Sequence, residues 1–368
     1  MVLFNEKNFE SFFQELTGHT PYLYQLDTAR AIWEGKNCIL QIPTGCGKTW
    51  AVITPFLFSK KAGGRTRLIY ALPLRTLAQG VYQVAKQAAQ KCGLPVEAKV
   101  DQRGREVVNP SVTLQTGEQP DDPFFARGAI IITTYDQVLS GLLGGPYGLS
   151  GKLRNINAAA IAGALLVFDE FHLMPPQRAF LTAVAGNRMF KEITQSVWMT
   201  ATATSALTET IQDALNCKPI SLRPDDAGKI PSIAEVKRHL VYEQRPLSIA
   251  DVLQHPGERQ IVLVNTVGRA QQMISDLRNA LREYELDIPL LSLHSRFFKQ
   301  DRSRKEEDLR SAFAKNAKAP AILVATQVVE AGLDISSAHL HTEICPMNAL
   351  VQRAGRCARF PGENGTVH

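Results

Sequence analysis

The sequence has no apolar run long enough to cross a bilayer. Its longest largely apolar stretch, residues 155–168, ends at an Asp-Glu pair and falls short of the roughly 18 residues that a membrane-spanning helix needs. The N-terminus also lacks a basic segment followed by an apolar one, which argues against a secretory signal. We therefore expect a soluble, cytoplasmic protein with no membrane partner.

Cysteine is also scarce, and its spacing supports no covalent or metal framework. The six cysteines include no C-x-x-C pair, which argues against a zinc ribbon and gives no basis for a disulfide network. We therefore expect reduced thiols. No excess of one charge stands out either, because 41 basic and 35 acidic side chains give a net charge of 41 − 35 = +6. This excess favours an anionic partner only weakly.

What the sequence does have is enough apolar residues for two cores. At 368 residues and 45% hydrophobic content, it has the length of two domains. Short apolar runs alternate with helical segments, a pattern typical of buried parallel strands in an α/β fold. Small polar or charged residues follow nearly every run, and open α/β sheets bind ligands at that edge. The runs lie at 38–40, 68–72, 129–132, 164–168, 197–199, 261–264 and 321–325.

The periodicity lapses between residues 217 and 231, where prolines, aspartates and a glycine gather. This composition predicts a linker, after which a second α/β unit opens at 238–242. We accordingly predict two domains, comprising residues 1–235 and 236–368.

A phosphate-binding loop is predicted between the first strand and the helix that follows it. In such a loop, backbone N–H groups approach phosphates, a lysine reaches the β- and γ-phosphates, and a Ser or Thr hydroxyl binds Mg²⁺. Ile42 stands where the strict pattern has its first glycine. We expect the loop to bind ATP and Mg²⁺ through Thr44, Gly45, Cys46, Gly47, Lys48 and Thr49.

Two adjacent carboxylates, Asp169 and Glu170, end the apolar run at 164–168. A phosphate loop needs a metal-binding carboxylate and, for hydrolysis, a base for water. Consecutive side chains at a strand end point to opposite sides, so the pair can divide these roles. We expect Asp169 to bind Mg²⁺ and Glu170 to activate water, with Lys48 as a further catalytic residue.

With these motifs in this order, the chain resembles superfamily 2 helicases of the DExH type. The resemblance implies two tandem RecA-like domains, each a parallel sheet flanked by helices, with ATP in the cleft between them. It also implies that Gln25 reads adenine. His172, Thr200 and Thr202 would couple the nucleotide site to the nucleic acid.

Later motifs match the same family, and residues 352–359, Q-R-A-G-R-C-A-R, are the most specific. The resemblance makes Arg356 and Arg359 fingers on the γ-phosphate, with Gln352 as another catalytic residue, and places Gly332 and Asp334 at the nucleotide. Short hydroxyl side chains and arginines at strand ends suit contacts with a phosphate backbone. The residues expected to make such contacts are Arg75, Thr76, Thr133, Thr266, Ser295, Arg296 and Thr326.

Segments 134–139, 169–176 and 293–302 are similar to the helicase core of the CRISPR-associated helicase-nuclease of type I interference systems. This similarity implies 3′→5′ movement on single-stranded DNA, recruitment by a crRNA-guided surveillance complex, and delivery of DNA to an HD-type nuclease. None of the eight histidines is followed by aspartate, so we expect that nuclease to lie outside this sequence. We expect the histidines outside the helicase motifs to be core or surface residues rather than metal ligands.

The expected function is therefore an ATP-dependent DNA helicase, and two alternatives stay open. No motif distinguishes the 2′-hydroxyl of RNA, so an RNA helicase of the same superfamily fits as well. An ATP-gated clamp that does not travel is the other alternative. We also expect residue 368 to precede the natural end of the second domain, because residues 365–368 have the character of a strand that is beginning.

Overall fold

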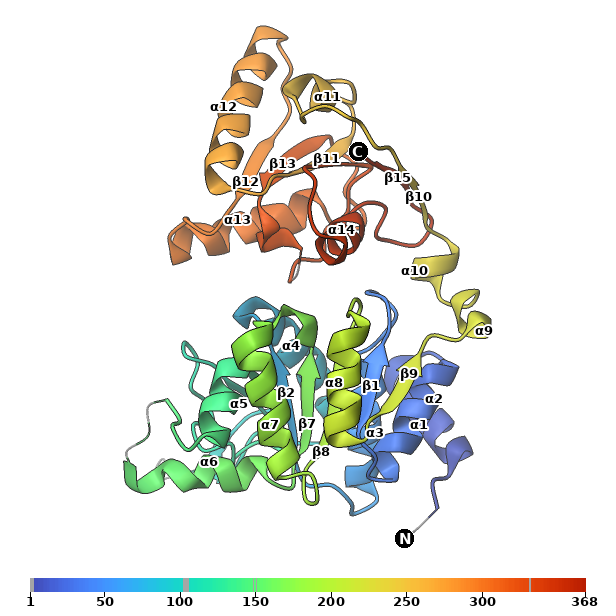
Figure 1. The fold of residues 1–368 in the computed structure, drawn as a ribbon, viewed down its shortest axis with the longest axis vertical. Coiled ribbons are helices and arrows are strands. Elements are labelled where there is room, and N and C mark those ends of the chain that lie inside the picture. Colours follow the sequence, from blue (N-terminus) through green and yellow to red (C-terminus); the bar gives the residue numbers. More distant parts are fainter. Residues whose placement is uncertain (1–2, 102–105, 148, 150, 331) are drawn as a thin grey trace. The chain divides into compact units, whose positions relative to one another are not determined.

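The computed structural model describes residues 3–101, 106–147, 149, 151–330 and 332–368. The chain divides into two compact units, Met1–Asp226 and Ala227–His368, each with its own sheet (Figure 1). Both units are α/β, in agreement with the sequence prediction. Among the described residues, no helix combines the length and apolar character that crossing a membrane requires.

Unit 1 contains a seven-stranded parallel sheet in the order β5-β6-β2-β7-β8-β1-β9. Its central strands are buried along their whole length, as expected when helices cover both faces of a parallel sheet. The strands are β1 (Cys38–Gln41), β2 (Leu68–Leu72), β5 (Val112–Gln115), β6 (Ile130–Thr134), β7 (Leu165–Asp169), β8 (Gln195–Thr200) and β9 (Lys218–Ser221). A separate antiparallel pair joins β3 (Lys99–Val100) and β4 (Glu106–Val108).

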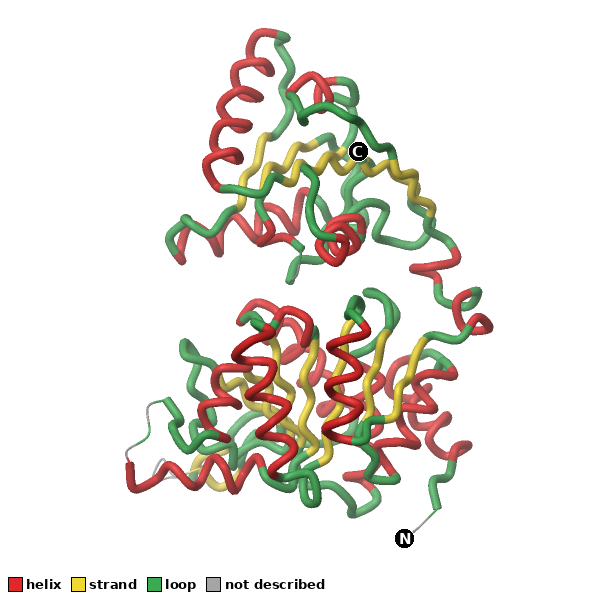
Figure 2. Tube along the Cα trace, in the orientation of Figure 1, coloured by secondary structure: helices red, strands yellow, loops and turns green. Residues whose placement is uncertain are grey.

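Two helical layers enclose this sheet (Figures 1 and 2). One is built from α1 (Glu6–Thr17), α2 (Leu23–Trp33), α3 (Trp50–Lys61) and α4 (Arg75–Lys91). The other contains α5 (Tyr135–Leu142), α6 (Arg154–Ile161), α7 (Leu181–Met189) and α8 (Ser205–Leu215), whose apolar side chains share a core with Ile69, Phe168 and Trp198. The short turns η1 (Gly151–Leu153), η2 (Phe171–Leu173) and η3 (Pro176–Phe180) lie in the connections.

Unit 2 contains a six-stranded parallel sheet in the order β10-β15-β14-β11-β13-β12. The strands are β10 (Lys237–Leu240), β11 (Arg259–Leu263), β12 (Leu290–Leu293), β13 (Ala321–Ala325), β14 (His339–Thr342) and β15 (Asn364–Val367). Helices α11 (Ile249–Leu253) and α12 (Val267–Glu283) pack on one face. Helices α13 (Lys299–Ala312) and α14 (Met347–Ala354), with the turn η4 (Gln327–Val329), pack on the other.

The predicted linker is partly wrong, because residues 218–221 form strand β9 at the edge of the unit 1 sheet. An edge strand tolerates the proline at position 219 and exposes most of its side chains, so it carries little apolar signal. The short helices α9 (Pro224–Ala227) and α10 (Pro231–Ala234) follow. Unit 1 ends at 226 rather than at the predicted 235, since buried Asp226 accepts hydrogen bonds from the N–H groups of Leu23 and Tyr24.

The strand expected at the end of the chain is formed. β15 lies between β10 and β14, and its Thr366 is in register with both His239 and His339. Val367 is buried in the core of unit 2.

Candidate nucleotide site and nucleic-acid surface

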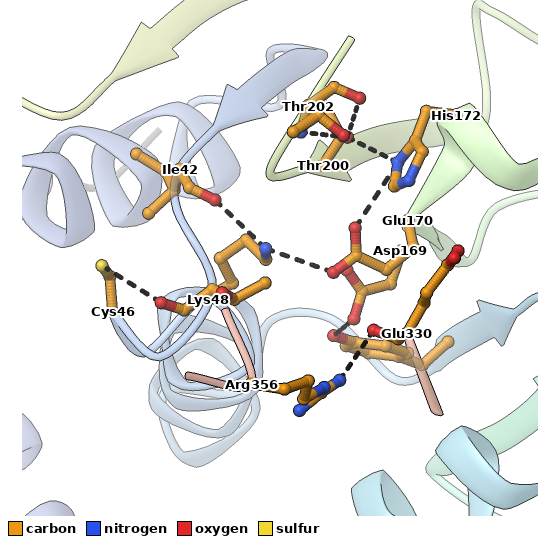
Figure 3. A network of polar contacts seen from close by, with 12 residues as sticks. Ile42, Cys46, Lys48, Asp169, Glu170, His172, Thr200, Thr202, Glu330 and Arg356 are labelled. Carbon is orange, nitrogen blue, oxygen red and sulfur yellow. Dashed lines mark hydrogen bonds and ion pairs between the residues drawn. The ribbon is translucent and has the colours of Figure 1, made fainter. Parts of the chain in front are cut away.

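The predicted phosphate loop follows β1 and leads directly into α3. Gly45 and Gly47 have φ angles of 80° and 86°, in the left-handed region that favours glycine. The buried Lys48 ammonium donates to the carbonyl oxygen of Ile42 at 3.1 Å and lies 3.3 Å from Oε1 of Glu170 (Figure 3). Ile42 therefore contributes its backbone to the loop while its side chain is buried in the core.

Two side chains of α2 donate hydrogen bonds to backbone carbonyls of the phosphate loop. Gln25 Nε2 donates to the carbonyl of Gly47 at 3.2 Å, and Tyr24 donates its hydroxyl hydrogen to the carbonyl of Cys46 at 2.5 Å. A Cβ on Gly47 would lie 3.0 Å from Gln25 Nε2, so a larger residue is excluded there by both φ and space. Gln25 Oε1 accepts from the N–H of Tyr22, which fixes the amide. The role of Gln25 in reading adenine stays a prediction.

Asp169 lies at the end of β7 and is buried. Its Oδ2 accepts a hydrogen bond from the Tyr70 hydroxyl at 2.7 Å, whereas its buried Oδ1 has no hydrogen-bond partner. Burial, reinforced by the neighbouring Glu170, raises the pKa of Asp169 to about 7. A buried carboxylate oxygen without a donor suits a hard cation, and the Thr49 side chain also interacts with the Tyr70 hydroxyl. Asp169 and Thr49 therefore fit the predicted Mg²⁺ ligands.

A chain of contacts leads from Glu170 to the end of β8 (Figure 3). Glu170 Oε2 lies 3.5 Å from His172 Nδ1, which lies 2.7 Å from the Thr200 hydroxyl oxygen. That hydroxyl donates to the carbonyl of Thr202, so its oxygen accepts from His172 Nδ1–H. Burial lowers the pKa of His172, which favours a neutral ring. The structure thus brings together the residues predicted to couple the two sites.

The predicted nucleic-acid contacts divide into exposed and buried groups. Thr266, Ser295 and Arg296 are exposed, and Thr76 is half-buried. Arg75 is exposed and forms an ion pair with Glu118, with 2.6 Å between NH1 and Oε1.

Thr133 and Thr326, unlike the other predicted contacts, are both buried. Thr133 uses its hydroxyl within the sheet, where it donates to the carbonyl of Gln115 at 2.7 Å. Burial gives no support for a surface contact of these two residues, and their role in binding nucleic acid stays a prediction.

The two predicted arginine fingers differ in their surroundings within unit 2. Arg356 is buried and donates to the backbone carbonyls of Val329, Glu330 and Leu333 at 2.5–2.9 Å. Arg359 is half-buried and pairs with the exposed carboxylate of Asp334. Gln352 is buried on α14, and Gly332 has a φ of 88°. The catalytic roles of these residues stay predictions.

Arg353, to which the sequence assigned no role, connects several motifs of unit 2. It is 3% exposed and donates to Glu330 Oε1 and Thr342 Oγ1, each at 2.8 Å, and to Asn265 Oδ1 at 3.0 Å. Its signal in the sequence was its position as the first arginine of the 352–359 motif. The sequence also assigned no role to Tyr70 in unit 1, although it is the only polar residue of β2.

Comparisons with known proteins agree with this architecture. The profile of DEAD/DEAH box helicases matches residues 22–210, which is just over half of the chain. The profile described as "CRISPR-associated nuclease/helicase Cas3, C-terminal" matches residues 256–362.

The individual relatives that follow are also named as helicases or as Cas3. The CRISPR-associated helicase Cas3 of Thermoproteus tenax is 27% identical over 87% of this chain and 53% of its own length. The ATP-dependent RNA helicase DBP8 of Debaryomyces hansenii is 26% identical over 93% of the chain and 74% of its own length. The crystal structure of T. fusca Cas3 has the same fold, with a TM-score of 0.71 at 21% identity, over 97% of this chain and 47% of that one.

The chain spans about half the length of the CRISPR-associated relatives that it matches. The matches to the first unit and to most of the second follow one another along the sequence without overlap. The chain therefore belongs to the DEAD/DEAH box family of ATP-dependent helicases, with a second unit of the type found at the C-terminus of the CRISPR-associated nuclease/helicase Cas3.

Proposed function

We propose that this chain is the motor of a type I CRISPR interference system, a 3′→5′ single-stranded DNA translocase that hydrolyses ATP. The observation that carries the proposal is the contact chain from Lys48 through Glu170 and His172 to Thr200. It links a phosphate loop to a strand end through a single carboxylate. The match of the second unit to the C-terminal domain of Cas3 supports the CRISPR assignment over other helicases.

Each residue has a defined task in this proposal. Lys48 binds the β- and γ-phosphates, and Glu170 orients the attacking water and takes its proton. Asp169 and Thr49 hold Mg²⁺, which neutralises charge on the phosphates when it is bound. His172 and Thr200 transmit the state of Glu170 to Thr202, while Arg356 and Arg359 of unit 2 stabilise the transferred phosphoryl group.

The first test removes the two groups at the start of the contact chain. Lys48→Ala and Glu170→Gln should each lower DNA-stimulated ATP hydrolysis by at least about 100-fold, because phosphate binding and water activation are separately essential. Lys191→Ala and Glu192→Gln are matched controls, since both side chains are exposed in the same unit. Undiminished hydrolysis in either site variant would overturn the assignment.

A second candidate, RNA unwinding, is favoured by the similarity to the RNA helicase DBP8 over most of the chain. Stimulation of ATP hydrolysis by DNA and RNA single strands of equal length and sequence separates the two. We expect DNA to stimulate more strongly. A preference for RNA would favour the second candidate.

The direction of movement and the partners are tested together with substrates of defined polarity. We expect ATP-dependent displacement of a labelled strand from a duplex with a 3′ overhang but not from one with a 5′ overhang. ATP hydrolysis without displacement of either strand would favour the clamp.

A crRNA-guided surveillance complex bound to its target should increase displacement, and an HD nuclease domain or subunit should then cut the released strand.

A further inference from the structure

Histidines gather on one face of the unit 2 sheet, although they are far apart in the sequence. His339 and His341 alternate on β14, and His368 follows β15 directly. The fourth, His255, precedes β11 in the connection from α11. The ring centroids of His255 and His339 are 3.7 Å apart, and those of His341 and His368 are 4.7 Å apart. The helicase motifs use none of these residues.

Three of these rings present donor atoms at distances that suit a metal ion. One ring nitrogen from each of His255, His339 and His368 lies within 4.8 Å of the others. His339 Nδ1 and His368 Nε2 lie 3.1 Å apart and share a hydrogen bond. Two imidazoles on a tetrahedral zinc ion, with Zn–N bonds of roughly 2.0–2.1 Å, place their nitrogens about 3.3–3.4 Å apart. This pair therefore already has nearly the separation of two ligands on one ion.

The second nitrogen of His339 has the partner that a metal-bound histidine usually has. Glu258 Oε1 lies 3.5 Å from His339 Nε2. A carboxylate that accepts from the second ring N–H orients the ring and raises the basicity of the metal-binding nitrogen. With Nε2 facing Glu258, His339 keeps Nδ1 for the position shared with His368.

His341 provides an independent indication that this region is prepared for a ligand. It is fully buried, and its Nε2 lies 3.0 Å from Gln260 Oε1, so Nε2 carries the hydrogen. Its buried Nδ1 has a free electron pair and no hydrogen-bond partner. His341 and His368 also line a cavity of about 790 Å³ with Arg245 and Arg269. Of the three histidines with neighbouring ring nitrogens, His368 is the one that borders this cavity.

We propose that His255, His339 and His368 form a binding site for one divalent transition-metal ion of the zinc class. Three imidazoles favour Zn²⁺, Co²⁺, Ni²⁺ or Cu²⁺ over Mg²⁺, which requires oxygen ligands. Burial lowers the pKa of both His339 and His368, and metal binding needs neutral rings. The rings of His255 and His339 are stacked at 12°, so the proposed site requires His255 to rotate about its side-chain bonds when the ion binds.

The experiment is a calorimetric titration of the full chain, without a histidine tag, with Zn²⁺ in the presence of excess Mg²⁺. Excess Mg²⁺ competes for the oxygen ligands proposed in unit 1, so the remaining signal reports a site that Mg²⁺ does not occupy. We expect one Zn²⁺ per chain, and at least about tenfold weaker binding in His255→Ala and in His368→Ala. His19→Ala, which changes an exposed histidine of unit 1, should bind like the wild type.

Two further readouts separate metal binding from structural damage. Co²⁺ should give the visible absorption of a tetrahedral nitrogen site in the wild type and lose it in His255→Ala. Zn²⁺ should raise the unfolding temperature of the wild type but not of the two variants, whose metal-free unfolding temperatures should match the wild type. Absence of Zn²⁺ binding, or equal affinity in the wild type and both variants, overturns the proposal.

Discussion

Tyr70 is the residue whose contribution to the nucleotide site is easiest to isolate. It is fully buried in β2, and its hydroxyl donates to Asp169 Oδ2 at 2.7 Å. The hydroxyl of Tyr135 donates to the backbone carbonyl of the same aspartate. The two tyrosines fix both the side chain and the main chain of the proposed Mg²⁺ ligand, and so act as positioning residues.

Tyr70→Phe removes one hydroxyl and keeps the ring. We expect the Mg²⁺ concentration for half-maximal ATP hydrolysis to rise by about tenfold, because an unoriented Asp169 binds the ion less well. Hydrolysis at saturating Mg²⁺ should change much less. Tyr147→Phe is the matched control, since this side chain is exposed in the same unit. An unchanged Mg²⁺ dependence with reduced stability would show that Tyr70 only supports the core.

At the residue scale, motif spelling predicted which side chains meet but not how each is used. Lys48, Glu170 and His172 lie in contact because short motifs fix them at the ends of β1 and β7, the two strands that flank β8. A hydroxyl at a strand end can instead turn into the sheet layer, as Thr133 does, and the sequence does not distinguish the two directions. Arg353 received no role from the sequence because its partners, among them Glu330 and Asn265, come from other segments of the chain.

At the scale of elements, the sequence predicted the strands that have continuous apolar runs and missed those that do not. The seven apolar runs correspond to β1, β2, β6, β7, β8, β11 and β13, whereas β5 is buried at every position but was missed because it alternates apolar and polar residues. Strand β14 reads His-Leu-His-Thr, so only Leu340 carries an apolar signal. Its alternate positions are histidines of the cluster rather than apolar residues, and this is the physical reason why apolar periodicity missed it.

Helix α11 offers a test of how a short element is held against the sheet. Asp251 is part of a capping box with Ser248 and accepts both guanidinium N–H groups of Arg245. Hydrogen bonds from Arg245 lower the pKa of Asp251 to about 2. Because the folded-state pKa is depressed, the contribution to stability is present above the unfolded value near pH 4 and is lost as pH falls toward about 2.

Asp251→Asn should therefore lower the free energy of unfolding by about 1 kcal/mol at pH 7, because the neutral amide loses the ion pair with the exposed Arg245. The difference between the wild type and the variant should shrink as pH falls from about 4 to about 2. Urea unfolding at several pH values measures it. Asp308→Asn, at an exposed position of α13, should show no such pH-dependent difference. A constant difference across this range would contradict the assigned pKa.

At the scale of the molecule, the proposed catalytic residues come from two units with separate cores. The groups that bind the phosphates, such as Lys48, lie in unit 1, whereas both arginines predicted as fingers belong to unit 2. Nucleotide binding and hydrolysis should thus be separable by mutation. The structure sharpens this expectation, because Arg356 is committed to the backbone of residues 329–333 whereas Arg359 pairs with a single exposed carboxylate.

Arg359→Ala should abolish most ATP hydrolysis. The affinity of this variant for a fluorescent ATP analogue should stay within twofold of the wild type. Its free energy of unfolding should stay within about 0.5 kcal/mol of the wild type. Arg356→Ala should also lose hydrolysis, but it should lower the free energy of unfolding by at least about 2 kcal/mol, since three buried carbonyls lose a charged donor. Arg310→Ala, exposed on α13, serves as the control for both variants. Equal destabilisation by the two finger variants would mean that Arg359 has a structural role, and full hydrolysis in Arg359→Ala would remove it from the proposed site.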